Sequence, residues 1–231
     1  MTRRPVFLLT VGFALMPGFA DAQLQSLPIY PTAVLQRGSS VAVDYGRDVD
    51  PSAGVAQHLG GRATLEAGRA SLELGAGLRD AGTDPDLQAA ASVGVRLLGG
   101  AASVLALGLQ LGAGYLSSGG GTSRAQHLTL PLSVGLAFRE IRAGAAGVRP
   151  WLAPRVQLNR VVFADVIVNQ PGVGGSGGVN VALPGRVGVH IGVDWSRFSD
   201  RRTASVTLFG GSRLTVGAGA YLRFGARAPT G

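Results

Sequence analysis

The sequence predicts an all-β protein, a closed up-and-down antiparallel barrel of ten transmembrane strands, with eight strands as the alternative. From Leu128 to Phe138 every second residue is apolar, and this two-residue period returns in many other segments of the chain. No segment after residue 22 is apolar over the ~20 residues that a membrane helix needs. Because successive side chains of a strand point to opposite faces, each row gives one apolar and one polar face. A sheet that enters hydrocarbon must also close, since every backbone group has to be paired there.

Ten segments near the length that a tilted membrane strand needs are expected to form the barrel. Short and long connections alternate between them, as turns and loops do at the two ends of such barrels. The longest connection, residues 163–185, is rich in glycine and is expected to be a flexible surface loop. Pro131, Pro150 and Pro154 each remove a ladder donor, so edges or bulges are expected there, and a bulge would explain why Trp151 is out of phase. The expected strands are residues 40–47, 60–67, 70–79, 87–98, 103–116, 127–139, 149–161, 186–196, 203–209 and 214–224.

The first 22 residues have the pattern of a secretory signal peptide. Two arginines form a basic start, an apolar stretch of roughly 11–13 residues follows, and Ala20 and Ala22 occupy the positions that signal peptidase reads. Cleavage is therefore expected before Gln23. The chain has no cysteine, which excludes disulfides, thiolate metal sites and a lipid-anchored lipoprotein. The expected organisation is a signal peptide over residues 1–22, a lead over 23–38, the barrel over 39–224 and a tail over 225–231.

All 21 basic residues are arginine, and the formal net charge is +8. Nucleic acid is not an expected partner, because export and the lack of a clustered basic face with interleaved aromatic residues argue against it. Arginines at strand ends would more plausibly meet the phosphates of lipid headgroups or lipopolysaccharide. Genomic base composition explains the choice of arginine over lysine at least as well.

The last expected strand, residues 214–224, resembles the C-terminal signature of bacterial outer-membrane proteins. In that pattern alternating apolar residues such as Leu222 precede a terminal aromatic residue, here Phe224, and Tyr221 lies on the other face. With the alternation and the signal peptide, the chain resembles the superfamily of small outer-membrane β-barrels of the OmpA, OmpX and OmpW size class. The resemblance implies a monomer in the outer membrane of a Gram-negative bacterium, surrounded by lipid and lipopolysaccharide. It also implies that the barrel assembly machinery recognises this strand, although the tail after Phe224 departs from the pattern.

Aromatic residues near strand ends are expected to form thin girdles at the two membrane interfaces. Phe138, Trp195 and Phe224 close their apolar rows and are expected at the periplasmic rim. Tyr45 and Tyr115 are expected at the opposite, outer end.

Ten polar or charged residues take the inward parity of their strands and are expected to line the lumen. An isolated charge in a narrow, low-dielectric interior is costly, so these side chains must pair or meet water. The structural interpretation is a salt-bridge network that plugs the lumen, and the functional one is a narrow arginine-lined pore that favours anions. The residues are Arg62, Glu66, Glu73, Arg96, Gln110, Arg139, Arg155, His190, Asp194 and Arg223.

No catalytic, cofactor-binding or metal site is expected. Lipid A deacylases of this fold class use a His and a Ser two residues apart, whereas His127 is followed by Thr129 and both point into the lumen. His190 and Asp194 lie roughly 13 Å apart along one strand, too far for a base and its orienting carboxylate. Asp194 is also expected near the periplasm, whereas omptin proteases act at the outer rim. An acidic set without calcium-loop spacing is expected to be a solvated turn, and it comprises Asp44, Asp48 and Asp50.

The expected function is therefore non-enzymatic: barrier integrity, lipopolysaccharide contact or surface adhesion. A narrow pore for small or apolar solutes is the second hypothesis. A lipid-acting enzyme is the third, and a soluble periplasmic sandwich is a distant fourth.

Overall fold

The computed structural model describes residues 38–49, 55–82, 85–100, 103–118, 125–163, 166–202, 207–208 and 210–224. The expected signal peptide and tail, and the expected lead apart from Gly38, lie outside these residues. Within the described part of the chain, no helix is long and apolar enough to span a membrane.

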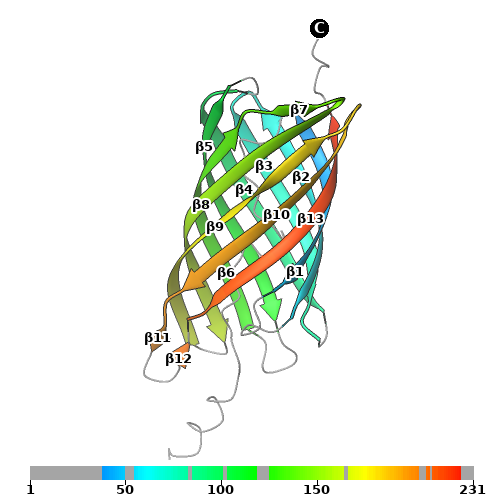
Figure 1. The fold of residues 1–231 in the computed structure, drawn as a ribbon. Helices are drawn as coiled ribbons and strands as arrows, with labels where there is room; N and C mark the ends of the chain where they lie inside the picture. The colour runs from blue at the N-terminus through cyan, green and yellow to red at the C-terminus, as the bar shows by residue number, and fades with distance from the viewer. Residues whose placement is uncertain are drawn as a thin grey trace, which may run out of the picture.

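Ten antiparallel strands close into one tilted barrel (Figure 1). Neighbours in sequence are neighbours in the sheet, β13 pairs with β1 and β10, and the β6–β8 pairing completes the ring. A short strand, β7, pairs antiparallel with the start of β8, and β11 pairs with β12 in a separate ribbon beyond the far end of the barrel. The strands are β1 (Ser39–Asp48), β2 (Gln57–Ala67), β3 (Ala70–Asp80), β4 (Asp86–Leu98), β5 (Leu105–Ser118), β6 (Ala125–Phe138), β7 (Ile141–Ala143), β8 (Ala146–Phe163), β9 (Val166–Ala182), β10 (Val187–Phe198), β11 (Arg201–Arg202), β12 (Thr207–Leu208) and β13 (Ser212–Phe224).

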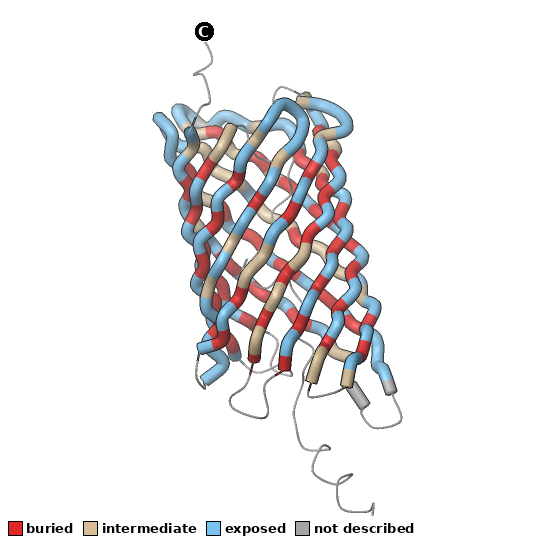
Figure 2. Tube along the Cα trace, turned by 180° about the vertical axis from the view of Figure 1, so that it is seen from behind, coloured by how far each residue is buried: buried red, intermediate tan, exposed pale blue. Residues whose placement is uncertain are grey.

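Buried and exposed residues alternate along the strands, as the sequence period predicts (Figure 2). In β6 the exposed residues are the apolar ones, from Leu128 to Phe138, and the buried ones are small or polar. This pattern is the reverse of that in a soluble protein, where apolar side chains are buried. The other barrel strands show it too, since each carries large apolar side chains on its outer face. The wall is therefore apolar outside and polar inside.

Pro131 and Pro154 do not create the expected bulges, but beside Pro150 the register shifts by one residue, because Ala137 pairs with Trp151 and Ile141 with Val148. The pairing of β6 with β5 and with β8 keeps one register past Pro131 and Pro154, and the paired positions are only interrupted beside these residues. Trp151 belongs to this regular register and faces the lumen, so no bulge is needed to explain its parity. A further register shift occurs in β4, between Arg96 and Leu98.

The sequence prediction missed one strand and added another. Residues 163–185, expected to be a loop, contain β9, which pairs with β8 and β10 over most of its length. Of the expected strand 203–209, the described residues form only β12, which lies outside the barrel. The predicted number of ten barrel strands is confirmed because these two errors cancel. Glycine has a low strand propensity, which is why the pattern of β9 was not recognised.

The missing strand also reversed the predicted direction of β10. Ser39 pairs with Phe224, so both ends of the barrel sequence lie at one rim, which we call the terminal rim. Val187 pairs with Leu222 near this rim, and Trp195 pairs with Leu214 at the other end, which we call the far rim. Trp195 therefore lies at the end opposite to the one predicted. Asp194 moves with it.

Close backbone approach explains one of the β9 glycines and makes a testable prediction. A Cβ added at Gly178 would lie less than 3.0 Å from the carbonyl oxygen of Ile191 on β10. At Gly61 the nearest atom to such a Cβ would be 3.7 Å away, which is ordinary contact. We expect Gly178→Ala to lower the free energy of unfolding by about 1–3 kcal/mol, because overpacking must displace backbone. Both variants are compared by urea titration of the protein refolded in lipid vesicles. Gly61→Ala should leave the free energy of unfolding nearly unchanged. Equal midpoints for the two variants would contradict the close approach at Gly178.

Candidate functional site

The lumen holds the charged side chains that the strand parity directs inward. Among the described residues, its ion pairs join five arginines to six carboxylates. They form separate groups at different heights rather than one continuous ladder.

The first group is centred on Arg62 of β2. Its Nε lies 2.8 Å from Oδ2 of Asp44 on β1, and its Nη1 lies 3.2 Å from Oε2 of Glu73 on β3. The hydroxyl of Thr64 also donates to Glu73, at 3.2 Å. One buried guanidinium thus faces two carboxylates on the two neighbouring strands.

His190 of β10 completes this group from two strands beyond β1. Its Nε2 lies 2.7 Å from Oδ1 of Asp44, while its Nδ1 lies 3.5 Å from Nη2 of Arg62. A neutral imidazole with its proton on Nε2 satisfies both contacts, because Nε2 then donates to Asp44 and Nδ1 accepts from Arg62. The ring also stacks on Tyr221, with the centroids 6.4 Å apart.

A glycine makes this contact possible. Asp44 and His190 belong to strands on either side of β13, and they meet over Gly219 of that strand. A Cβ at Gly219 would lie less than 3.0 Å from both side chains. The intervening strand therefore has to present no side chain at this position.

A second group lies nearer the far rim, and the sequence interpretation missed it. Arg213 of β13 donates to Asp48 of β1 at 2.6 Å and contacts Nε2 of His58 at 2.5 Å. Thr215 donates to Asp48 at 2.6 Å, and Gln88 lies 3.2 Å from the other nitrogen of His58. The signal was present, because Val41, Val43 and Tyr45 alternate with Asp44 and Asp48, which assigns both aspartates to the inner face of β1 instead of a solvated turn.

The third group is an arginine–carboxylate fork. Nη1 and Nη2 of Arg155 on β8 lie 2.7 and 2.6 Å from the two oxygens of Asp194 on β10. Arg155 also donates to Gln157 at 2.9 Å. Its side chain crosses over Gly174 of β9, where a Cβ would come within 3.2 Å of the guanidinium. Asp194 thus pairs with Arg155, and His190 with Asp44, so the two residues considered together in the sequence serve different groups.

Of the remaining predicted lumen residues, Gln110 is buried and Glu66, Arg96 and Arg223 are half-buried. Glu66 and Arg96 form an ion pair of 2.5 Å near the terminal rim, and Gln110 donates to Ser92 at 2.8 Å. Arg223 is half-buried over the ring of Tyr221, 5.8 Å from its centroid. Arg139 is the exception: β6 ends at Phe138, so Arg139 lies beyond the strand and is exposed rather than lumen-facing.

The opposite wall of the lumen is polar but largely uncharged. His127 and Thr129 are both buried there, and Nε2 of His127 lies 3.4 Å from the hydroxyl of Ser118. Towards the terminal rim Trp151 packs into a small apolar cluster with Ala106, Ala137 and Ala153. Within the described ranges no three His, Asp or Glu side chains are grouped to hold a metal ion.

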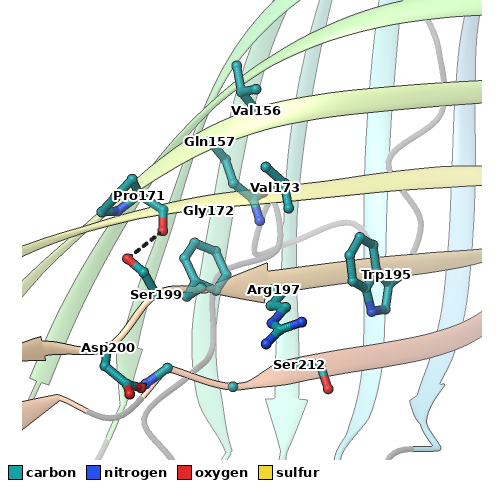
Figure 3. A pocket seen from close by; sticks show the side chains of 13 residues that line it. Val156, Gln157, Pro171, Gly172, Val173, Trp195, Arg197, Ser199, Asp200 and Ser212 are labelled. Carbon is teal, nitrogen blue, oxygen red and sulfur yellow. Dashed lines mark hydrogen bonds between the residues drawn. The ribbon is translucent and has the colours of Figure 1, made fainter.

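A groove of about 1070 Å³ lies at the far rim, and it is lined both by outward-facing residues and by the buried Gln157 and Phe198 (Figure 3). Val156 of β8, Val173 of β9 and Trp195 of β10 line its apolar part. Arg197 of β10 and Ser212 of β13 line its polar part. The hydrogen bond from the Ser199 hydroxyl to the Pro171 carbonyl, 3.2 Å long, lies beside it.

The Arg155–Asp194 fork makes a prediction about stability. Replacing one partner, as in Arg155→Met or Asp194→Leu, leaves a buried charge uncompensated and should cost about 3–5 kcal/mol. The double variant removes both charges and should recover most of that loss. Urea titrations of the three variants refolded in lipid vesicles give the coupling energy, and a double variant as unstable as the sum of the single ones would contradict the pairing.

The barrel is similar in fold to solved structures of bacterial outer-membrane proteins. Neisserial surface protein A (NspA) is 14% identical, with 81% of this chain and 98% of that chain covered and a TM-score of 0.43. The translocator domain of the autotransporter NalP from Neisseria meningitidis is 13% identical, with 82% and 89% covered and a TM-score of 0.40. The outer membrane protease OmpT from Escherichia coli is 11% identical, with 81% and 94% covered and a TM-score of 0.39. No protein-family model matches the chain, and no curated protein sequence does.

Proposed function

We propose that this protein is a non-enzymatic β-barrel of the bacterial outer membrane, exported by its signal peptide, with a structural, lipopolysaccharide-contact or adhesion role. The observation that carries the proposal is the apolar outer face, which appears on all ten barrel strands. In water such a surface would be strongly unfavourable, whereas in hydrocarbon it is the surface that a closed barrel needs. The partners that fit this role are lipid, lipopolysaccharide and, for the strand ending at Phe224, the barrel assembly machinery, with the protein as a monomer.

The paired charges favour this role over the alternative of a narrow pore. An anion-selective path needs cationic side chains that are available to the ion. Arg62, Arg155 and Arg213 are instead buried and engaged with carboxylates, so an entering anion would have to break ion pairs.

The position of the histidines argues against a lipid-acting enzyme. His127 and Thr129 are buried on the lumen side, away from the outer face on which acyl chains would lie. His190 contacts Asp44 and Arg62, and Asp194 is held by Arg155. An unchanged lipid A mass spectrum in cells with and without the protein is the expected result, and an altered acyl composition would overturn the non-enzymatic role.

The lipid-facing side predicts a depth-dependent cost of charge. Leu132 lies on the outer face near the middle of β6, and Gln126 lies on the same face near its far-rim end. Leu132→Arg should destabilise the protein folded in lipid vesicles by about 2–4 kcal/mol, and Gln126→Arg by at most about 1 kcal/mol. Urea titration monitored by tryptophan fluorescence measures both, and vesicle flotation shows whether each variant has inserted. Equal costs for the two variants would argue against a membrane around this face.

The conductance of the purified barrel separates the structural role from the pore. In a planar lipid bilayer we expect no unitary current, because the lumen arginines Arg62, Arg155 and Arg213 are buried and paired with carboxylates. The protein should still show heat-modifiable mobility on gels, which reports that the barrel is folded. Reproducible single-channel steps from such folded protein would establish the pore instead.

A further inference from the structure

We propose that the groove at the far rim binds the phosphorylated headgroup and one acyl chain of lipopolysaccharide. This inference rests on the proposed outer-membrane location, with both barrel termini on the periplasmic side. The far rim then lies in the outer leaflet, where lipopolysaccharide is found.

The groove exists because two neighbouring strands end at different heights. β9 and β10 pair as far as Gly172 and Phe198; beyond them Ser199 still donates to the Pro171 carbonyl, and β9 then continues outward paired with β8. At the step, the ring of Phe198 packs against Gly172, where a Cβ would lie 2.7 Å from it. The ring can pack this closely only because Gly172 has no side chain. The shape of the groove is therefore set by residues of the barrel strands themselves.

The lining has the two-part chemistry of an amphiphile. Val156, Val173 and Trp195 are 57%, 50% and 40% exposed, and they continue the apolar outer face of the barrel. Arg197 and Ser212 follow at the end of the groove nearer the rim. A water-soluble ligand would leave the apolar part uncovered, and a plain hydrocarbon chain would leave the polar part unused.

The guanidinium of Arg197 supplies the charge complementarity. Arg197 is exposed, and no carboxylate among the described residues forms an ion pair with it. Asp200, which also lines the groove, accepts a 2.5 Å hydrogen bond from the backbone of Gly210. Arginine matches the geometry of a phosphate with two parallel donors, and Trp195 beside it is typical of a membrane interface.

The test uses the full-length folded protein with two lipids that share the phosphate but not the source. Detergent-solubilised protein is incubated with lipopolysaccharide or with phosphatidylglycerol, and native mass spectrometry counts the lipids retained. Arg197→Gln should reduce retained lipopolysaccharide about tenfold, the loss expected from one charge-assisted contact, and should leave phosphatidylglycerol unchanged. Arg142→Gln is the matched control, because Arg142 is an exposed arginine on β7 at the terminal rim.

A second variant tests the apolar part. Val173→Trp fills the groove from the outer face and should also lower lipopolysaccharide retention, while Arg142→Gln should not. Heat-modifiable mobility confirms that each variant is folded. Unchanged retention in Arg197→Gln would overturn the site, and an equal fall for phosphatidylglycerol would overturn its assignment to lipopolysaccharide. Failure of the unaltered protein to float with vesicles would instead overturn the proposed membrane location.

Discussion

The structure depends on neutralising charge in an interior that the closed wall removes from water. Because the apolar residues take the outward positions, most charged residues of the alternating strands face the lumen. A charge left alone there would cost several kcal/mol, and an arginine–carboxylate fork such as Arg155–Asp194 offsets that cost only with good geometry. The ion pairs therefore act as a check on register, since a one-residue slip of β8 or β10 would turn one partner to the lipid.

The spacing of the partners explains where glycine is required. Arg155 and Asp194 lie on strands separated by β9, and Asp44 and His190 lie on strands separated by β13. Side chains on such strands can meet only if the strand between them offers no obstacle, which is the role of Gly174 and Gly219. Glycine weakens β9 as a strand, but at Gly174 it leaves the space that the Arg155–Asp194 ion pair needs.

The need for glycine between paired side chains also limits what the sequence could predict. Two-residue alternation located strands such as β3 and β6 well, because their outer faces are continuous rows of apolar residues, mostly leucine. It failed in β9, where the residues that make room for neighbours carry no side chain and leave no period to read. The error then reversed β10 and moved Asp194 to the wrong end of the barrel. The inward parity of Arg62 and Glu73 was readable locally, but their partners were not, because pairing depends on strand order and register.

A neutralised interior leaves the outer face and the rims as the places where this barrel can contact other molecules. β9 serves both regions, and the two meet at Gly172, which faces the lumen side and also lines the groove. Gly172 and Gly174 face the lumen side, where they accommodate Phe198 and Arg155, whereas Pro171 and Val173 face outward and line the groove. An outward residue such as Val173 can therefore change to suit a lipid without disturbing the ion pair behind it, whereas a side chain at Gly174 would meet the guanidinium of Arg155.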